Sequence, residues 1–322
     1  MRVAVLQGGR SSEHEVSLRS GASVGVGLGA AGHTEIPVLI GRDGRWTCFG
    51  EEVTLVAGAG LLDCDAAFPV LHGPFGEDGS VQGLLECLDV PYVGSDVLAS
   101  ALCLDKLSLK RLLAFHGIPQ VKFVQAGGDE WRERAIAMGL PLWVKPSRLG
   151  SSVGISKVTS PESGLDEAVE LARRHDPRVI VEAAAEGREV ECSVLGNEEP
   201  ETSQPGEIVA HAEWYDYEAK YSEGGMELVV PAPLEPAVLG RVRELAARVF
   251  TLAGCSGLAR CDFFVADGGE VLVNEINTMP GFTETSVYAK LFEASGIGYA
   301  ELCDRLVRLG IERHERARSF EF

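Results

Sequence analysis

Short apolar runs alternate with helix-like stretches over the first 95 residues. The runs suit buried strands, which read as near-continuous apolar segments in parallel sheets, and strands that alternate with helices predict a parallel α/β sheet. The expected strands are 3–6, 34–40 and 66–71, and the expected helices are 15–31 and 80–88. Strands end at Gly8 and His72, so we expect both following loops at the edge where such sheets bind ligands.

The pattern changes after a predicted helix over 97–116. Two strands at 141–145 and 155–158 are separated only by a loop, which predicts antiparallel pairing. The remaining expected elements are a helix at 161–174, a strand at 178–183, short strands after 186, a polar loop at 216–226, a helix at 236–253, a hairpin and two closing helices. The chain is therefore predicted to combine α/β and α+β parts in three domains, 1–95, 96–185 and 186–322.

Composition narrows the function classes. The 322 residues contain 29 Lys+Arg against 48 Asp+Glu, a formal net charge of −19, which argues against broad nucleic-acid binding. Eight scattered cysteines without a C-x-x-C pair indicate reduced thiols and no zinc site. The apolar run before Gly8 is too short for a signal peptide, and no run approaches the ~18 residues of a membrane span. We expect a cytoplasmic protein without a membrane partner.

Two glycine motifs match known patterns but sit in the wrong context. The segment 27–32 fits G-x-G-x-x-G, yet it closes a helical stretch and precedes a strand, whereas a dinucleotide fingerprint opens a helix. The segment 150–154 fits the G-x-S-x-G of hydrolases, which requires a helix directly after the serine. A strand-like run follows instead, so a serine hydrolase is a remote alternative.

The segment Lys145–Gly154 is better interpreted as a phosphate grip. Its glycines and serines offer backbone N–H groups to anionic oxygens, and Lys145 adds a positive charge at the end of a strand. Polar hairpin loops are common, however, and an ordinary loop remains an equal alternative at this point.

The hairpin 258–278 carries the strongest signal. A two-residue turn at Gly268-Gly269 would place Asp262 opposite Glu275, and Arg260 opposite Asn277. Facing carboxylates repel each other unless a cation lies between them. Carboxylate and amide oxygens are ligands that magnesium uses beside phosphates, and an arginine there can neutralise developing negative charge. The hairpin therefore predicts a metal site.

Two loops at the predicted sheet edge are less decisive. Glu13 follows Gly8-Gly9 at the start of a helix, where it could bind a ligand or simply complement the helix dipole. His72 begins another glycine-rich loop, and a lone histidine of this kind is more often structural than catalytic.

Several segments, in order along nearly the whole chain, resemble the D-alanine–D-alanine ligases of the ATP-grasp superfamily. They are GGRSSEHEVSLRS (8–20), LHGPFGEDGSVQG (71–83), ASALCLDK (99–106), VKPSRLGSSVGISKV (144–158), YDYEAKY (215–221), and GLARCDFF with NEINTMPGFTETS (257–286). The resemblance implies a three-domain ATP-grasp architecture whose N-terminal domain is the α/β one. ATP would be held between the central and C-terminal domains.

The resemblance also implies roles for individual residues. Nucleotide contacts fall on Lys106, Lys145, Ser151, Ser152, Glu182, Ala183, Glu189, Lys220 and Asn274. Two Mg²⁺ (or Mn²⁺) ions would be held by Asp262, Glu275 and Asn277. Glu13 would receive the ammonium of the first D-alanine, Ser286 would lie near the second carboxylate, Arg260 and the Gly281 N–H would form the oxyanion site, and Tyr221 with Ser151 and Glu13 would close a loop over it. Relatives often carry lysine where Ala183 stands and proline after Ser286.

The implied reaction is ATP-dependent ligation of two D-alanines through an acyl phosphate, in peptidoglycan precursor synthesis and so in cell wall biogenesis. The resemblance further implies a homodimer. Alternatives are a D-alanyl-D-lactate or D-alanyl-D-serine ligase of the same fold, another ATP-grasp carboxylate–amine ligase, and a catalytically silent ATP-binding module. The intact segment 217–221, the Glu13 and Ser286 matches and the retained hairpin residues argue against these three in turn.

Overall fold

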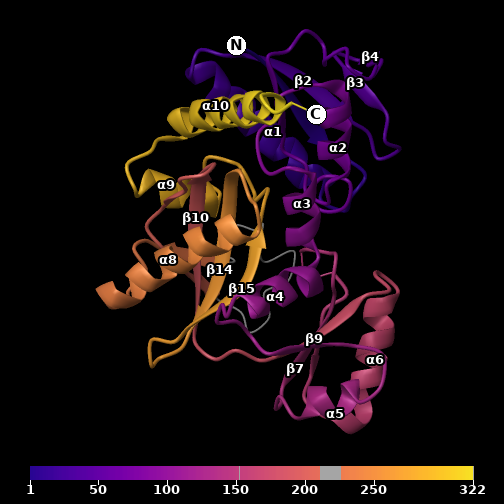
Figure 1. The fold of residues 1–322 in the computed structure, drawn as a ribbon, viewed down its shortest axis with the longest axis vertical. Coiled ribbons are helices and arrows are strands. Elements are labelled where there is room, and N and C mark those ends of the chain that lie inside the picture. The colour runs from indigo at the N-terminus through magenta and orange to yellow at the C-terminus, as the bar shows by residue number, and fades with distance from the viewer. Residues whose placement is uncertain (152, 211–225, 322) are drawn as a thin grey trace.

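The computed structural model describes residues 1–151, 153–210 and 226–321. Within them, three β-sheets follow one another along the chain, from the indigo N-terminal part through the magenta part to the orange part (Figure 1). The strand orders are β4-β3-β2-β1-β5, β6-β9-β7-β8 and β13-β12-β10-β14-β15, with β11 paired to β10. The expected mixture of α/β and α+β parts is confirmed.

The N-terminal sheet is built around β1. It pairs in parallel with β2 and β5, which confirms the predicted parallel sheet. The elements are β1 Arg2–Gly8, α1 His14–Ala30, β2 Thr34–Ile40, β3 Trp46–Cys48, β4 Glu51–Glu52, β5 Ala66–Pro69 and α2 Ser80–Leu88. Strands β3 and β4 extend the sheet in antiparallel fashion and were not predicted, because they are only two or three residues long and carry no buried side chain.

The single helix expected over 97–116 is two helices. α3 Val97–Leu104 ends at Asp105, and α4 Lys106–Phe115 begins directly after it. Asp105 has an extended backbone, with φ −82° and ψ 93°, and its side chain accepts a hydrogen bond from Ser108 N at 3.2 Å. It is thus an N-cap that restarts the helix in a new direction. The break places Lys106 in the first turn of α4.

The second sheet is antiparallel throughout. The predicted strand–loop–strand pair is confirmed, because Leu142 lies opposite Val158 in β7 and β8. The elements are β6 Phe123–Gln125, α5 Trp131–Ile136, β7 Leu142–Pro146, β8 Ser156–Val158, α6 Pro161–Arg173 and β9 Val179–Ala183. Because β8 follows Gly150–Gly154 as a strand, the hydrolase elbow is excluded at this position.

The third sheet carries the predicted metal hairpin. Its elements are β10 Arg188–Gly196, β11 Glu201–Thr202, β12 Gly206–Ala210, β13 Met226–Val229, α8 Pro236–Leu252, β14 Gly257–Val265 and β15 Val271–Asn277. Helices α9 Val287–Glu293 and α10 Tyr299–Arg318 close the chain. The polar loop expected at 216–226 lies almost wholly outside the described residues.

The hairpin register at the predicted site is confirmed, but the predicted turn is wrong. Asp262 lies opposite Glu275, and Arg260 lies opposite Asn277. Nearer the turn, Val265 pairs with Val271, which is one residue out of that register. The connection is a three-residue loop, 267–269, and a β-bulge at Asn274 restores the predicted register at the site. An extra residue of this kind twists a strand and often lies beside active sites.

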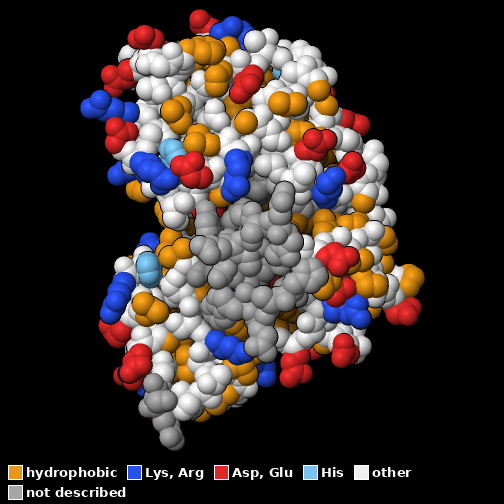
Figure 2. Space-filling view, turned by 180° about the vertical axis from the view of Figure 1, so that it is seen from behind, with side chains coloured by type: hydrophobic (Ala, Val, Ile, Leu, Met, Phe, Trp, Pro, Cys, Tyr) orange, Lys and Arg blue, Asp and Glu red, His pale blue; other side chains and the backbone are white. Residues whose placement is uncertain are grey.

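The C-terminal helix α10 returns to the N-terminal sheet, and Figure 1 shows it beside α1. Gly27 lies where these helices cross, because a Cβ there would meet Cys303 Sγ at 2.7 Å. The segment 27–32 closes α1 before β2, as the sequence context predicted, and Gly27 in addition allows the close packing of the two helices. No helix among the described residues is long and apolar enough to span a membrane. On the face shown in Figure 2, acidic and basic side chains are interspersed.

Candidate active site

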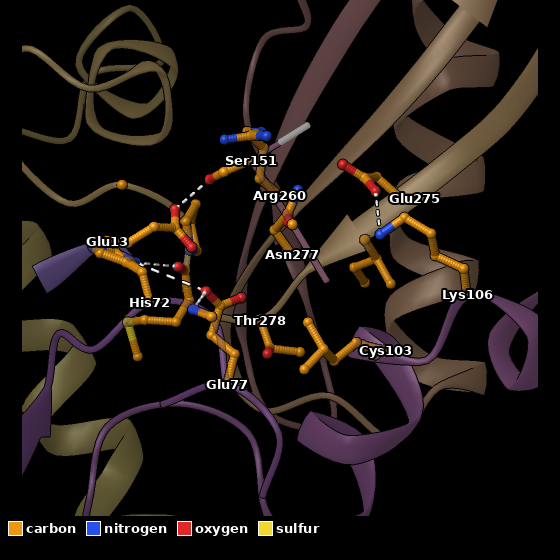
Figure 3. Close-up of a pocket in the computed structure, with 17 residues that line it drawn as sticks. Glu13, His72, Glu77, Cys103, Lys106, Ser151, Arg260, Glu275, Asn277 and Thr278 are labelled. Carbon is orange, nitrogen blue, oxygen red and sulfur yellow. Dashed lines mark hydrogen bonds and ion pairs between the residues drawn. The ribbon is translucent and has the colours of Figure 1, made fainter. Parts of the chain in front are cut away.

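Loops and strand ends from different parts of the chain enclose a cavity of about 120 Å³. In Figure 3, Glu13, His72 and Glu77 stand on one side, Lys106 and Glu275 on the other, with Arg260 and Asn277 between them. The lining residues are Glu13, His72, Gly73, Glu77, Cys103, Leu104, Lys106, Gly150, Ser151, Arg260 and 275–281. The predicted loops after Gly8 and His72 do meet at this cavity.

Glu13 faces the cavity instead of capping its helix. It occupies the N-cap position of α1, yet its side chain makes no capping hydrogen bond. Its carboxylate instead accepts a hydrogen bond from Ser151 Oγ at 2.5 Å, and the side chain is buried. Ser151 has a positive φ of 53°, so the glycine-rich loop is bent toward Glu13 at this residue. Glu13 therefore makes no capping hydrogen bond in this structure, and its carboxylate is held by the glycine-rich loop, while its N-cap position still lets its charge complement the dipole of α1.

His72 is held from both sides. Its Nδ1 lies 3.1 Å from Met279 O, and its Nε2 lies 3.2 Å from Ser20 Oγ. Burial lowers the pKa of His72, although the negative charge of Glu13 opposes the change. These contacts fix the ring between α1 and the 278–281 segment, which supports the structural interpretation of His72. The side chain also borders the cavity.

Glu77 has a perturbed ionisation. Its Oε1 accepts a hydrogen bond from Gly73 N at 2.7 Å. Burial, together with the nearby charge of Glu13, raises the pKa of Glu77 to about 8, although the Gly73 hydrogen bond opposes this shift. A carboxyl that is neutral near pH 7 can donate a proton or a hydrogen bond.

The hairpin carboxylates are compensated by cations of the protein itself. Arg260 donates from Nε and Nη2 to the two oxygens of Asp262, both at 2.8 Å. Its Nε also lies 2.8 Å from Glu191 Oε2. Burial would lower the pKa of Arg260, but the charges of Asp262 and Glu191 raise it. Asn277 Nδ2 donates to Asp262 Oδ2 at 3.2 Å, which joins the two strands at the site.

Lys106 bridges the hairpin and the glycine-rich loop. Its Nζ donates to Leu149 O at 2.8 Å and lies 3.3 Å from Glu275 Oε2. The lysine thus stands between a carboxylate of β15 and the backbone of the loop predicted to hold phosphates. An ammonium in this place can receive an anionic ligand that enters from the cavity.

Lys145 belongs to a second, more deeply buried cluster. Glu182 lies between two ammonium groups, 2.7 Å from Lys145 Nζ and 2.9 Å from Lys110 Nζ. Burial alone would raise the pKa of Glu182, but the charges of Lys110 and Lys145 outweigh it and lower the pKa to about 2. Burial likewise would lower the pKa of Lys145, and Glu182 raises it. Lys145 and Glu182 lie in the second sheet, where β7 and β9 pair, and Lys110 reaches Glu182 from α4.

The other predicted residues have these places. Ala183 ends β9, and its N–H donates to Lys122 O at 3.0 Å. Glu189 lies on β10 and Asn274 at the β15 bulge. Ser286 Oγ accepts a hydrogen bond from Thr283 N at 2.9 Å, and a Cβ built on Gly281 would lie 3.4 Å from it. Ser152, Lys220 and Tyr221, which the resemblance also assigns to the site, lie outside the described residues.

The donor set at the hairpin suits a hard cation. Asp262, Glu275 and Asn277 offer only oxygen ligands, and the confirmed register brings them together. The described residues contain no group of three or more His, Cys, Asp and Glu side chains close enough to hold a metal ion. Two carboxylates and one amide oxygen suit magnesium, which takes the rest of its six oxygen ligands from phosphate groups and water.

Sequence reasoning missed Lys110, Glu77 and Glu191. Lys110 lies one helical turn after Lys106, so the i, i+4 spacing was a signal that could have marked it. Glu191 lies two residues after Glu189 and therefore on the same strand face. Glu77 offered no such spacing, because its burial depends on the fold of its loop.

Comparisons with known proteins agree with this geometry. Residues 112–308 match a family model described as D-ala D-ala ligase C-terminus, and residues 2–60 and 57–95 match the model of the N-terminus. D-Alanine–D-alanine ligase of Deinococcus radiodurans is 48% identical to this chain, over 97% of this chain and 98% of that protein. The ligase of Halothermothrix orenii is 42% identical, over 97% and 98%.

Solved structures show the same likeness. The D-alanine-D-alanine ligase from Coxiella burnetii superposes with a TM-score of 0.89 at 36% identity, covering 99% of this chain and 96% of that one. The VanG D-Ala:D-Ser ligase from Enterococcus faecalis superposes with a TM-score of 0.87 at 35% identity, covering 96% and 99%. Given the family models, the identities over nearly the full chain and the shared fold, this chain belongs to the D-alanine–D-alanine ligase family and has the ATP-grasp fold.

Proposed function

We propose that this protein is an enzyme that joins two D-alanine molecules into D-alanyl-D-alanine at the expense of ATP, with ADP and phosphate as the other products. One observation carries the proposal: Glu13, Ser151, Lys106, Arg260 and Glu275 come from separate segments and line one cavity. An amino-acid ammonium, a phosphate chain and a developing oxyanion each find a side chain of opposite charge there.

The residues divide the work by charge. Glu13 receives the ammonium of the first D-alanine, and the Ser151 hydroxyl keeps this carboxylate turned toward the cavity. Lys106 and Lys145 hold the phosphates of ATP, and we assign Ser151, Ser152 and Lys220 to nucleotide contacts from the family resemblance. Glu182, Ala183, Glu189 and Asn274 belong to the nucleotide side. Phosphoryl transfer from ATP to the first carboxylate needs little covalent help from the protein, so positioning and charge neutralisation are the main contributions.

The second half of the reaction uses the other wall of the cavity. The amine of the second D-alanine attacks the acyl phosphate, while Ser286 lies near its carboxylate. Arg260 and the Gly281 N–H stabilise the negative oxygen that forms on the attacked carbon, a contribution of roughly 3–4 kcal/mol for each donor. Tyr221, with Ser151 and Glu13, closes the cavity against water, which would otherwise hydrolyse the acyl phosphate.

Asp262, Glu275 and Asn277 are proposed to hold two Mg²⁺ or Mn²⁺ ions. When bound, such ions neutralise phosphate charge during transfer. We further propose the domain division 1–95, 96–185 and 186–322, a homodimeric assembly, and a cytoplasmic role in supplying the dipeptide for peptidoglycan. The three sheets, which lie within these three ranges, support the division, whereas α3 and α4 pack in the core of the third sheet and α10 packs on the N-terminal sheet.

The test is incubation of the purified protein with ATP, Mg²⁺ and D-alanine, with phosphate and dipeptide measured together. We expect equal amounts of both products. D-Serine and D-lactate, offered as second substrates in competition with D-alanine, test the alternative favoured by the likeness to a D-Ala:D-Ser ligase. A preference for D-serine would reassign the second substrate, and phosphate release without any ligated product would overturn the proposal.

A further inference from the structure

The two lysines proposed to hold the ATP phosphates belong to separately packed parts of the molecule. Lys106 begins α4, whose Leu109 and Leu113 pack in the core of the third sheet. Lys145 lies on β7, whose Leu142 and Val144 pack in the core of the second sheet. The spacing between the two ammonium groups therefore depends on how these two parts are joined.

Asp105 stands at this junction. The residue is 6% exposed, and its Oδ1 accepts a hydrogen bond from Ser147 Oγ at 2.7 Å in addition to the capping bond from Ser108 N. Its other oxygen pairs with the guanidinium of Arg178, which precedes β9. An ordinary N-cap needs only one oxygen and one helix N–H. The contacts with Ser147 and Arg178 reach beyond the helix into the second sheet.

Ser147 completes the joint from the other side. It is fully buried and lies two residues after Lys145. Its carbonyl accepts a hydrogen bond from Lys106 N at 2.9 Å, and its Oγ accepts one from Leu107 N at 3.0 Å. The first N–H groups of a helix have no partner within the helix. Here two of them are bound by the segment that carries the other lysine.

We propose that Asp105 is a positioning residue, which acts through Ser147 and Arg178 to fix Lys106 and Lys145 at the spacing that ATP phosphates require. The same joint directs Lys106 Nζ to Leu149 O, so it also sets where the glycine-rich loop begins. This inference rests on the proposed function, because it assumes that both lysines bind phosphate.

The first test is Asp105→Asn, which keeps the size of the side chain and removes the charge that faces Arg178. We expect the KM for ATP to rise about 5- to 30-fold, while the KM for D-alanine stays within about twofold, because a charged hydrogen-bond partner is lost at the ATP side only. Ser147→Ala should have the same selective effect. It provides a second measurement if Asp105→Asn yields too little folded protein.

Asp166→Asn is the control. Asp166 accepts hydrogen bonds from Arg132 Nε at 2.9 Å and Nη2 at 2.5 Å within the same part of the chain, but its pair is exposed and has no contact with either lysine. We expect the KM values for ATP and for D-alanine to stay unchanged in this variant. Thermal unfolding of each variant separates a loss of folded protein from a loss of ATP affinity.

A double-mutant cycle separates this inference from the proposed function. If Asp105 acts by placing Lys106, Asp105→Asn should weaken ATP binding little further in a Lys106→Ala background. The positioning role would be overturned if the two substitutions weakened ATP binding by fully additive free energies. It would also be overturned if Asp105→Asn raised the KM for ATP and the KM for D-alanine equally. Unchanged ATP binding in Lys106→Ala alone would instead contradict the phosphate assignment of the proposed function.

Discussion

At the scale of single residues, each of three described cations of the proposed site, two at the cavity and one in the buried cluster of the second sheet, already has a carboxylate partner. Lys106 pairs with Glu275, Arg260 pairs with Asp262, and Lys145 pairs with Glu182. A polyanionic substrate must therefore compete with these carboxylates unless a metal ion takes them over. This arrangement explains how an acidic chain can keep cations for ATP without leaving isolated buried charges.

Glu275→Gln tests the metal role. We expect ligation to become strongly dependent on magnesium and nearly lost at limiting magnesium, because one anionic ligand is replaced by a neutral one. If Asp262 and Glu275 repelled each other in the metal-free protein, the substitution would also raise its stability. In the structure, however, Lys106 pairs with Glu275 and Arg260 pairs with Asp262, so we expect no gain in stability. A magnesium titration of the rate checks the prediction.

The control for this substitution is Glu293→Gln, which removes a carboxylate from an exposed pair with Lys290. It should leave the magnesium dependence unchanged. Normal turnover of Glu275→Gln at limiting magnesium would remove Glu275 from the metal site.

Glu77 predicts a pH dependence of stability. Its pKa is near 4.5 when the chain is unfolded and about 8 when it is folded. The folded state therefore holds more protons between these values, and the free energy of unfolding falls as pH rises through this window. Glu77→Gln should flatten this fall. Urea unfolding in EDTA at about pH 5 and about pH 8 measures the difference, and an equally steep fall in the variant would show that another group titrates.

Residue types and order were enough to predict most of the candidate side chains, but not their partners. Glu13 could not be separated from a helix-capping residue until its contact with Ser151 was visible. Lys110 was missed, since a lysine within a helix is usually solvated, and only the fold shows that it is 1% exposed beside Glu182.

At the scale of elements, local patterns predicted strands and helices well and connections less well. The helix expected over 97–116 breaks at Asp105, because a hydrogen bond from the distant Ser147 stabilises the aspartate in its capping position. The Gly268-Gly269 turn was wrong, since the bulge at Asn274 shifts the register by one residue. The helix break adjoins Lys106 and the bulge lies at Asn274, and both of these are proposed site residues, where function commonly overrides local preference.

The crossing of α1 and α10 gives a prediction at this scale. Gly27→Ala should destabilise the protein by roughly 1–3 kcal/mol, because its Cβ would overlap Cys303 and Tyr299 and overpack the crossing. Gly29→Ala is the matched control in the same helix, where nothing lies within 4 Å of the added Cβ. It should stabilise by about 0.5–1 kcal/mol through helix propensity. Thermal or urea unfolding of both variants checks the signs, and equal effects would contradict the packing role.

At the scale of the whole molecule, the three sheets are not equally independent. One hydrophobic core contains Val3 and Phe68 of the N-terminal sheet, Leu258 of the third sheet and Leu306 of α10. Among the described residues, the core of the second sheet draws only on the range 124–181. The sequence could not predict the first of these cores, because it joins segments some 300 residues apart.

This division predicts that the molecule opens in two steps. Leu306→Ala should lower the protection of backbone amides against hydrogen exchange in β1 and β14 together, because the fully buried Leu306 belongs to the core that both sheets share. The free energy of the opening that exposes these amides should fall by about 2–5 kcal/mol. The protection of amides in β7 and β9 should change little.

Leu165→Ala, a matched change at a residue 2% exposed in the core of the second sheet, should have the reverse effect. Hydrogen exchange measured by mass spectrometry under native conditions distinguishes the two patterns. If each substitution lowered protection equally in all three sheets, the molecule would unfold as one cooperative unit, and the junction at Asp105 would have to transmit stability as well as position.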